Sequence, residues 1–146
     1  MGVIFASDPC EICGYQPHST LFYHGGKLGF FKGLATCNAC REIVSIYPDE
    51  VRIPSGFTEM FGGVDAYQTH AVSMRARLNL EPPALNTCPF CHSHDLTHHD
   101  IWEVFVSKQP IQIPCPRSET GYVVLTPSGM WIRNQSSWGD DDGKRV

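Results

Sequence analysis

Short apolar runs, each bounded by glycine, proline or polar residues, recur along the chain and predict short β-strands. In the N-terminal part, two aromatic runs at 20–23 and 28–31 flank a turn at 24–27 that contains two adjacent glycines. This arrangement is typical of a β-hairpin. Residues 42–47 predict a third strand, which Pro48 and Asp49 would end.

The C-terminal part continues the same pattern of short strands. Apolar and polar positions alternate from Trp102 to Ser107, as in a strand with one buried face. Residues 111–113, 122–125 and 130–132 predict three more strands separated by proline and glycine turns. The last eight residues, 139–146, include three consecutive aspartates and no periodic apolar pattern, so we expect a disordered acidic tail.

One segment in the middle of the chain has the period of a helix. Its apolar residues recur at spacings of three and four, which predicts an amphipathic helix over residues 64–80. Pro82 and Pro83 cannot continue a helix, so we expect it to stop before them. The apolar stripe consists of Val64, Tyr67, Ala71, Met74 and Leu78.

Length and charge limit the classes of protein to consider. The 146 residues suffice for one ordinary domain or two very small ones. A formal net charge of -4 disfavours a protein that binds nucleic acid mainly through its phosphates. The first residues lack the positive start and apolar run of a signal peptide, and no 18 consecutive residues are apolar. We therefore expect a cytoplasmic protein without a membrane-spanning helix.

The strongest chemical signal is the spacing of the cysteines. Six of the seven form CxxC pairs, at 10–13, 37–40 and 88–91, and Cys115 stands alone. In a reducing compartment such pairs indicate metal ligands or redox thiols rather than disulfides. Each pair can form a tight turn that directs two sulfurs at one ion.

The first two pairs predict a structural zinc site. Cys10, Cys13, Cys37 and Cys40 would supply four thiolates, because the expected hairpin brings their turns together. This constellation resembles a zinc ribbon over residues 9–47. Cys13-Gly14-Tyr15 also resembles the first knuckle of rubredoxin, which implies iron as the alternative metal.

The remaining cysteines predict a second, incomplete ribbon. Cys88, Cys91 and Cys115 would supply three thiolates, and Ser118 stands where a fourth cysteine would complete the second knuckle. One of four nearby histidines would then complete the site, with His94 or His99 preferred over His92 and His98. The alternative is a ribbon that has lost its metal and is held together by aromatic packing.

Three sharper interpretations of the second site remain open. Cys88-Pro89-Phe90-Cys91 resembles the glutaredoxin active site, although no helical pattern follows it. The pattern Cys88-x-x-Cys91-His92 is that of covalent haem attachment. Three ligands and a water would make a catalytic zinc site, with Glu103 as a candidate base. The spacing, however, matches neither the HExxH motif nor the deaminase signature of HxE followed by PCxxC.

A basic surface around the first hairpin offers a different function. Lys27, Lys32 and Arg41 lie among aromatic residues, and nucleic acid can bind such a surface by stacking and phosphate contact. In a small ribbon the same aromatics would form the core, which we expect here. Arg75 and Arg77 could extend this basic surface. They also lie near the C-terminal end of the expected helix, where positive charges interact favourably with the helix dipole.

The sequence therefore predicts a small β-rich, metal-stabilised α+β fold. Two zinc-ribbon-like modules, 1–53 and 87–138, would be joined by a linker and amphipathic helix over 54–86, with the tail 139–146. No nucleophile with its base and no phosphate-binding glycine loop stands out, so we expect no enzymatic activity. The leading hypothesis is a zinc-binding adaptor that interacts with another protein. A nucleic-acid-binding ribbon is the alternative, followed by a metal-dependent or redox enzyme that uses the second site.

Overall fold

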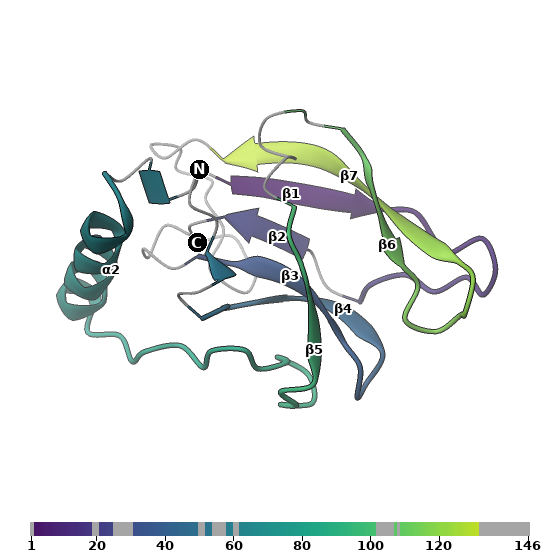
Figure 1. Cartoon of the computed structure of the whole chain (residues 1–146), viewed down its shortest axis with the longest axis horizontal. Helices are drawn as coiled ribbons and strands as arrows, with labels where there is room; N and C mark the ends of the chain where they lie inside the picture. Colours follow the sequence, from purple (N-terminus) through teal and green to yellow (C-terminus); the bar gives the residue numbers. More distant parts are fainter. Residues whose placement is uncertain are drawn as a thin grey trace.

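The structure is a computed structural model that describes residues 2–18, 21–24, 31–49, 52–53, 58–59, 62–101, 107 and 109–131. The described elements are short strands and one long helix (Figure 1). In chain order they are β1 (Gly2–Ser7), β2 (Leu21–His24), β3 (Gly33–Cys37), β4 (Glu42–Ile46), α2 (Val64–Leu78), β5 (Leu96–His99), β6 (Ile111–Pro114) and β7 (Tyr122–Trp131).

The strands form two antiparallel sheets. The four-stranded sheet has the order β2-β1-β7-β6, and the three-stranded sheet has the order β4-β3-β5. In Figure 1 the two sheets lie next to each other, and α2 stands at one end of the molecule. Two registers matter for the cysteines, because Ser7 on β1 pairs with Leu125 on β7 and Cys37 on β3 pairs with Leu96 on β5.

Each sheet combines strands from both ends of the chain, which corrects the expected pair of separate ribbon modules. β1 comes from the range 1–53 and pairs with β7 from the range 87–138. β3 likewise comes from the first range and pairs with β5 from the second. The physical reason is core size. Two- or three-stranded units are marginally stable alone, whereas sheets that share strands can bury one continuous core.

That core lies between the sheets. Buried residues of the four-stranded sheet, such as Leu21, Val123 and Leu125, cluster with Leu34 and Ile43 of the three-stranded sheet. The other face of the three-stranded sheet is also covered. Here a second cluster joins Ala35, Cys37, Val44, Ile46 and Cys88. Consequently β3 and β4 are buried along their whole length.

Several predicted elements are confirmed and others are corrected. The strands at 42–46 and 111–114 lie where the apolar runs predicted them. The runs 122–125 and 130–132 belong to a single strand, β7, up to its end at Trp131. β2 pairs with β1, and the other half of the expected hairpin, like the expected strand from Trp102 and the tail, lies outside the described residues.

The predicted helix is confirmed but ends two residues early. Asn79 adopts a left-handed conformation, with φ 58°. Its N–H donates to Ala76 O at 3.2 Å, and the Leu80 N–H donates to Arg75 O at 2.9 Å. These bonds satisfy the last carbonyls of the helix, so a local cap rather than the prolines ends it.

Only the middle of the predicted apolar stripe is buried. Tyr67 and Ala71 are buried, whereas Val64 and Leu78 near the helix ends are about half exposed. In the described part of the chain, α2 included, no helix combines the length and apolarity needed to cross a bilayer.

Candidate metal centres

All three CxxC turns have the same backbone conformation after the second cysteine. The residues that follow, Gly14, Arg41 and His92, have φ values of 76°, 56° and 63°. In two of the turns this residue donates its N–H to the carbonyl of the first cysteine, at 2.8 Å for Gly14 and 3.0 Å for His92. A left-handed conformation costs least at Gly14, which has no side chain. Arg41 and His92 adopt it despite their side chains.

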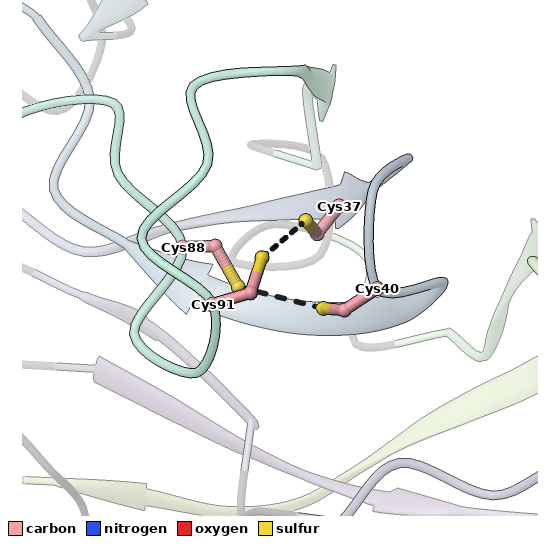
Figure 2. Close-up of side chains that lie close together, drawn as sticks. All are labelled: Cys37, Cys40, Cys88 and Cys91. Carbon is pink, nitrogen blue, oxygen red and sulfur yellow. Dashed lines mark hydrogen bonds between the residues drawn. The ribbon is translucent and has the colours of Figure 1, made fainter.

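Four cysteines converge at one end of the three-stranded sheet. The sulfurs of Cys37, Cys40, Cys88 and Cys91 all lie within 4.8 Å of one another. Cys37 Sγ is 3.5 Å from Cys91 Sγ, and Cys40 Sγ is 3.7 Å from Cys88 Sγ (Figure 2). Sulfurs that bind a tetrahedral zinc ion at about 2.3 Å lie about 3.8 Å apart. The cluster therefore has the size of a four-thiolate metal site.

Strand pairing brings these two knuckles together. Cys37 ends β3 and Cys40 lies in the turn to β4, whereas Cys88 and Cys91 lie in the turn that precedes β5. β3 and β5 are neighbours, and the Asn38 N–H extends their pairing by donating to Asp95 O at 2.9 Å. The two turns consequently face each other at one end of the sheet (Figure 2).

The electrostatics of the four thiols favour a bound cation. Cys37 and Cys88 are completely buried, Cys40 is half-buried and Cys91 is exposed. Burial raises the pKa of the Cys40 and Cys88 thiols, whereas the backbone N–H of Ser93 and the neighbouring thiols lower the pKa of Cys91 to about 7. Four thiolates at these distances would repel one another, and a divalent cation removes that repulsion.

The other three cysteines form a second cluster. The sulfurs of Cys10, Cys13 and Cys115 lie within 4.8 Å of one another, and Cys13 Sγ is 3.5 Å from Cys115 Sγ. Cys10 follows β1 and Cys115 follows β6, and both strands pair with β7. The Ser118 hydroxyl oxygen lies 3.5 Å from Cys10 Sγ.

The thiols of this second cluster differ in acidity. The backbone N–H of Cys13 and the Ser118 hydroxyl lower the pKa of Cys10 to about 6. The backbone N–H of Tyr15 favours the Cys13 thiolate, but burial and the neighbouring Cys115 and Cys10 thiols raise the pKa of Cys13 overall. Of the two cysteines in the knuckle 10–13, Cys10 is thus favoured as the thiolate, which is the form that binds metal.

The structure corrects the expected grouping of the cysteines. The sequence interpretation joined the knuckle 10–13 to the knuckle 37–40, and the knuckle 88–91 to Cys115. Instead, the knuckle 37–40 meets 88–91, and 10–13 meets Cys115. The interpretation assumed that sequence neighbours share a metal. Pairing of β3 with β5, and of β1 and β6 with β7, decides the grouping instead.

The histidines expected to complete the second site bond elsewhere. His94 Nδ1 lies 3.0 Å from Asn86 O, to which it can donate, and its side chain is exposed. His99 on β5 lies with Nε2 2.7 Å from Thr36 Oγ1 on β3. Burial, followed by the nearby positive charge of His98, lowers the pKa of His99. Neither His94 nor His99 belongs to a cysteine cluster of the described residues.

A buried carboxylate that the sequence analysis missed links the two centres. Glu42, one residue past the 37–40 turn, is 4% exposed and accepts a hydrogen bond from the Tyr15 hydroxyl at 2.8 Å. Arg117, from the turn after Cys115, pairs with Glu42 at 2.5 Å and donates from Nε to Arg41 O at 3.2 Å. The sequence feature that could have revealed this carboxylate is one acidic residue at the start of an apolar run.

Beside this link lies an open polar hollow of about 470 Å³. Its walls come from both centres, because they include Cys37 and Arg41 on one side and Arg117 and Ser118 on the other. Lys32, another predicted basic residue, is not among the residues that line it. Lys32 is buried with its ammonium 4.6 Å from the centre of the Tyr47 ring, and Lys27 lies outside the described residues.

Fold and site together define a β-rich protein with two cysteine clusters that could each hold a metal ion. All seven cysteines are free thiols in this structure. Comparison of the chain with protein families, with curated proteins and with solved structures found no match.

Proposed function

We propose that this chain is a non-enzymatic zinc protein, in which a structural zinc ion holds the fold and the outer surface binds another protein. The closed cluster of Cys37, Cys40, Cys88 and Cys91 carries this proposal. Four protein ligands fill a tetrahedral ion, which leaves no position for a substrate or an activated water. Zinc at such a site contributes folding energy directly.

We favour zinc over iron because of what surrounds the cluster. Ala35, Val44 and Ile46, which pack with the buried cysteines, are aliphatic. The knuckle that resembles rubredoxin, Cys13-Gly14-Tyr15, belongs to the other cluster. A reducing compartment such as the cytoplasm is the setting we propose, because there the seven thiols stay available for metal.

Exposed apolar side chains support the adaptor role. They belong to α2 and to the segment that follows it, and they are between 39% and 55% exposed. We infer that they contribute to an interaction surface, because contiguous exposed apolar patches mark such surfaces. They are Val64, Val72, Leu78, Leu80 and Leu85.

Nucleic acid remains the alternative partner, with less support than the sequence suggested. Of the three predicted basic residues, Lys32 is buried over the Tyr47 ring and is poorly placed to reach a phosphate. Arg41 is exposed. A protein with net charge -4 and so few local cations should bind phosphates weakly, with a shallow salt dependence.

The metal part of the proposal is tested by analysis of the protein purified under anaerobic conditions. We expect zinc rather than iron, and we expect a strong chelator to unfold the protein, as followed by circular dichroism and restored by added zinc. A protein that keeps its spectrum and thermal midpoint without metal would contradict a structural role.

The adaptor part is tested with two helix variants. Val72→Asp places a charge on the exposed apolar surface of α2, whereas Thr69→Asp places it at an exposed polar position of the same helix. A cross-linked partner should be recovered with wild type and Thr69→Asp but lost with Val72→Asp. Submicromolar, salt-sensitive binding of DNA or RNA that Arg41→Glu weakens would instead favour the nucleic-acid alternative.

A further inference from the structure

We propose that the second cluster is a zinc site in which the Ser118 hydroxyl is the fourth ligand, beside Cys10, Cys13 and Cys115. This centre shares no residue with the closed four-cysteine site, so it can fail while the proposed structural role of that site holds. The proposal rests on three observations about the Ser118 turn.

The first observation is the separation between Cys10 and Ser118. Their Sγ and Oγ atoms are 3.5 Å apart. Tetrahedral zinc with bonds of about 2.3 Å to sulfur and about 2.0 to 2.1 Å to oxygen separates these two ligand atoms by about 3.5 to 3.6 Å. On the other side of the cluster, Cys13 Sγ and Cys115 Sγ are also 3.5 Å apart. Both distances therefore match a mixed sulfur and oxygen site.

The second observation is that the turn 115–118 shares two hydrogen bonds with the knuckle 88–91, although Glu119 lacks the left-handed conformation of His92. The Arg117 N–H donates to Cys115 Sγ at 3.4 Å, as the Phe90 N–H donates to Cys88 Sγ at 3.4 Å. The Cys115 N–H closes its loop on Gly121 O at 2.9 Å, as the Cys88 N–H closes on Ser93 O at the same distance. Ser118 thus occupies the position of the second ligand of a metal-binding knuckle.

The third observation is the space that Gly121 leaves. A Cβ at this buried position would overlap Cys10 Sγ and would lie 2.5 Å from Ser118 Oγ. The Gly121 N–H instead donates to Ser118 Oγ at 3.1 Å. The glycine therefore lets the backbone approach the two ligand atoms, and its N–H fixes the Ser118 oxygen beside the sulfurs.

A hydroxyl in place of a thiolate makes this centre weaker than the four-cysteine site. The ion would keep three charged ligands instead of four. Each centre has one exposed cysteine, Cys13 here and Cys91 in the other, so the missing charge rather than exposure separates the two. The second zinc ion should therefore exchange first, while the first ion stays bound.

The proposal is tested in the full chain with wild type and three variants, Ser118→Ala, Ser118→Cys and Ser128→Ala. Ser128 is an exposed serine on β7 and serves as the matched control. The measurements are zinc stoichiometry by native mass spectrometry, zinc affinity by chelator competition, and the absorption of the cobalt(II) protein.

We expect two zinc ions in wild type and in Ser128→Ala. Because loss of a supporting contact already costs about 10- to 100-fold in metal affinity, Ser118→Ala should weaken the second ion by at least that factor. Ser118→Cys should tighten it and raise the sulfur-to-cobalt charge-transfer absorption, because eight sulfurs rather than seven would bind metal.

Two results would overturn the proposal. One is a single zinc ion in wild type that depends on Cys88 and not on Cys115. The other is an unchanged second affinity in Ser118→Ala together with no added charge-transfer absorption in Ser118→Cys. Gly121→Ala provides an independent check, because it should release the second ion. Gly33→Ala, whose Cβ would meet its nearest atom at 3.4 Å, should not.

Discussion

Cys88→Ser is expected to weaken binding of the metal ion held by the knuckle 37–40, although Cys88 is 48 residues from Cys40 in the chain. The serine would replace a thiol that is completely buried and lies 3.7 Å from Cys40 Sγ. The ion would keep three thiolates and would face a buried hydroxyl in place of the fourth.

The size of the loss follows from the energy of structural zinc sites. Such sites contribute about 10 to 16 kcal/mol, so an even share for one of four thiolates is about 2.5 to 4 kcal/mol. This share corresponds to a loss of roughly 10²- to 10³-fold in zinc affinity, because about 1.4 kcal/mol is a factor of ten. It is also a large part of the about 5 to 15 kcal/mol that stabilises an ordinary domain.

Chelator competition and native mass spectrometry of four variants would measure the effect. Cys40→Ser and Cys88→Ser should weaken the same ion, and the double variant should lose about twice the share of either single one, because each residue supplies one thiolate to that site. Cys10→Ser serves as the control and should leave that ion in place. If Cys10→Ser and Cys40→Ser release the same ion while Cys88→Ser keeps it, the pairing of β3 with β5 is wrong.

Three further predictions concern stability. Tyr15→Phe should lower the free energy of unfolding in urea by about 1 to 3 kcal/mol, because buried Glu42 and the Ile43 N–H each lose the Tyr15 hydroxyl as a partner; an unchanged midpoint would contradict this role. Leu34→Ala should cost about 2 to 5 kcal/mol in the same assay, because Leu34 is 1% exposed in the shared core. Burial lowers the pKa of His99 below its ordinary value of 6.5, so the unfolded chain takes up this proton first as the pH falls. Stability should therefore decrease below about pH 6.5 at constant free zinc, and His99→Gln should flatten that decrease.

Two strands show why local pattern did not identify every element. β5 (Leu96–His99) lies at the edge of its sheet, where its side chains are partly exposed to solvent. Its residues are therefore polar, and its sequence has the composition of a loop. β1 (Gly2–Ser7) lies between β2 and β7. Val3 and Phe5 are buried and Ala6 is exposed, but the residues are apolar at both kinds of position, so no alternation in the sequence marked the strand. Both strands are essential to the metal centres, since they position the knuckles.

The sequence by itself determined the chemistry of each knuckle. Two cysteines separated by two residues can direct both sulfurs at one ion only if the chain turns back sharply, and the CxxC spacing predicted such a turn for each pair. The substitution that leaves Ser118 in place of a fourth cysteine was also visible in the sequence. These features depend on a few consecutive residues, so local reasoning was sufficient.

Only the tertiary structure decided which cysteines meet. The seven thiols are chemically alike, and their separation along the chain carries no information about which sulfurs come within about 4 Å of one another. Pairing of β3 with β5 brings 88–91 to 37–40, and pairing of β1 and β6 with β7 brings Cys115 to 10–13. The strands pair in the way that lets the whole chain bury one core. The grouping of the ligands follows from that pairing.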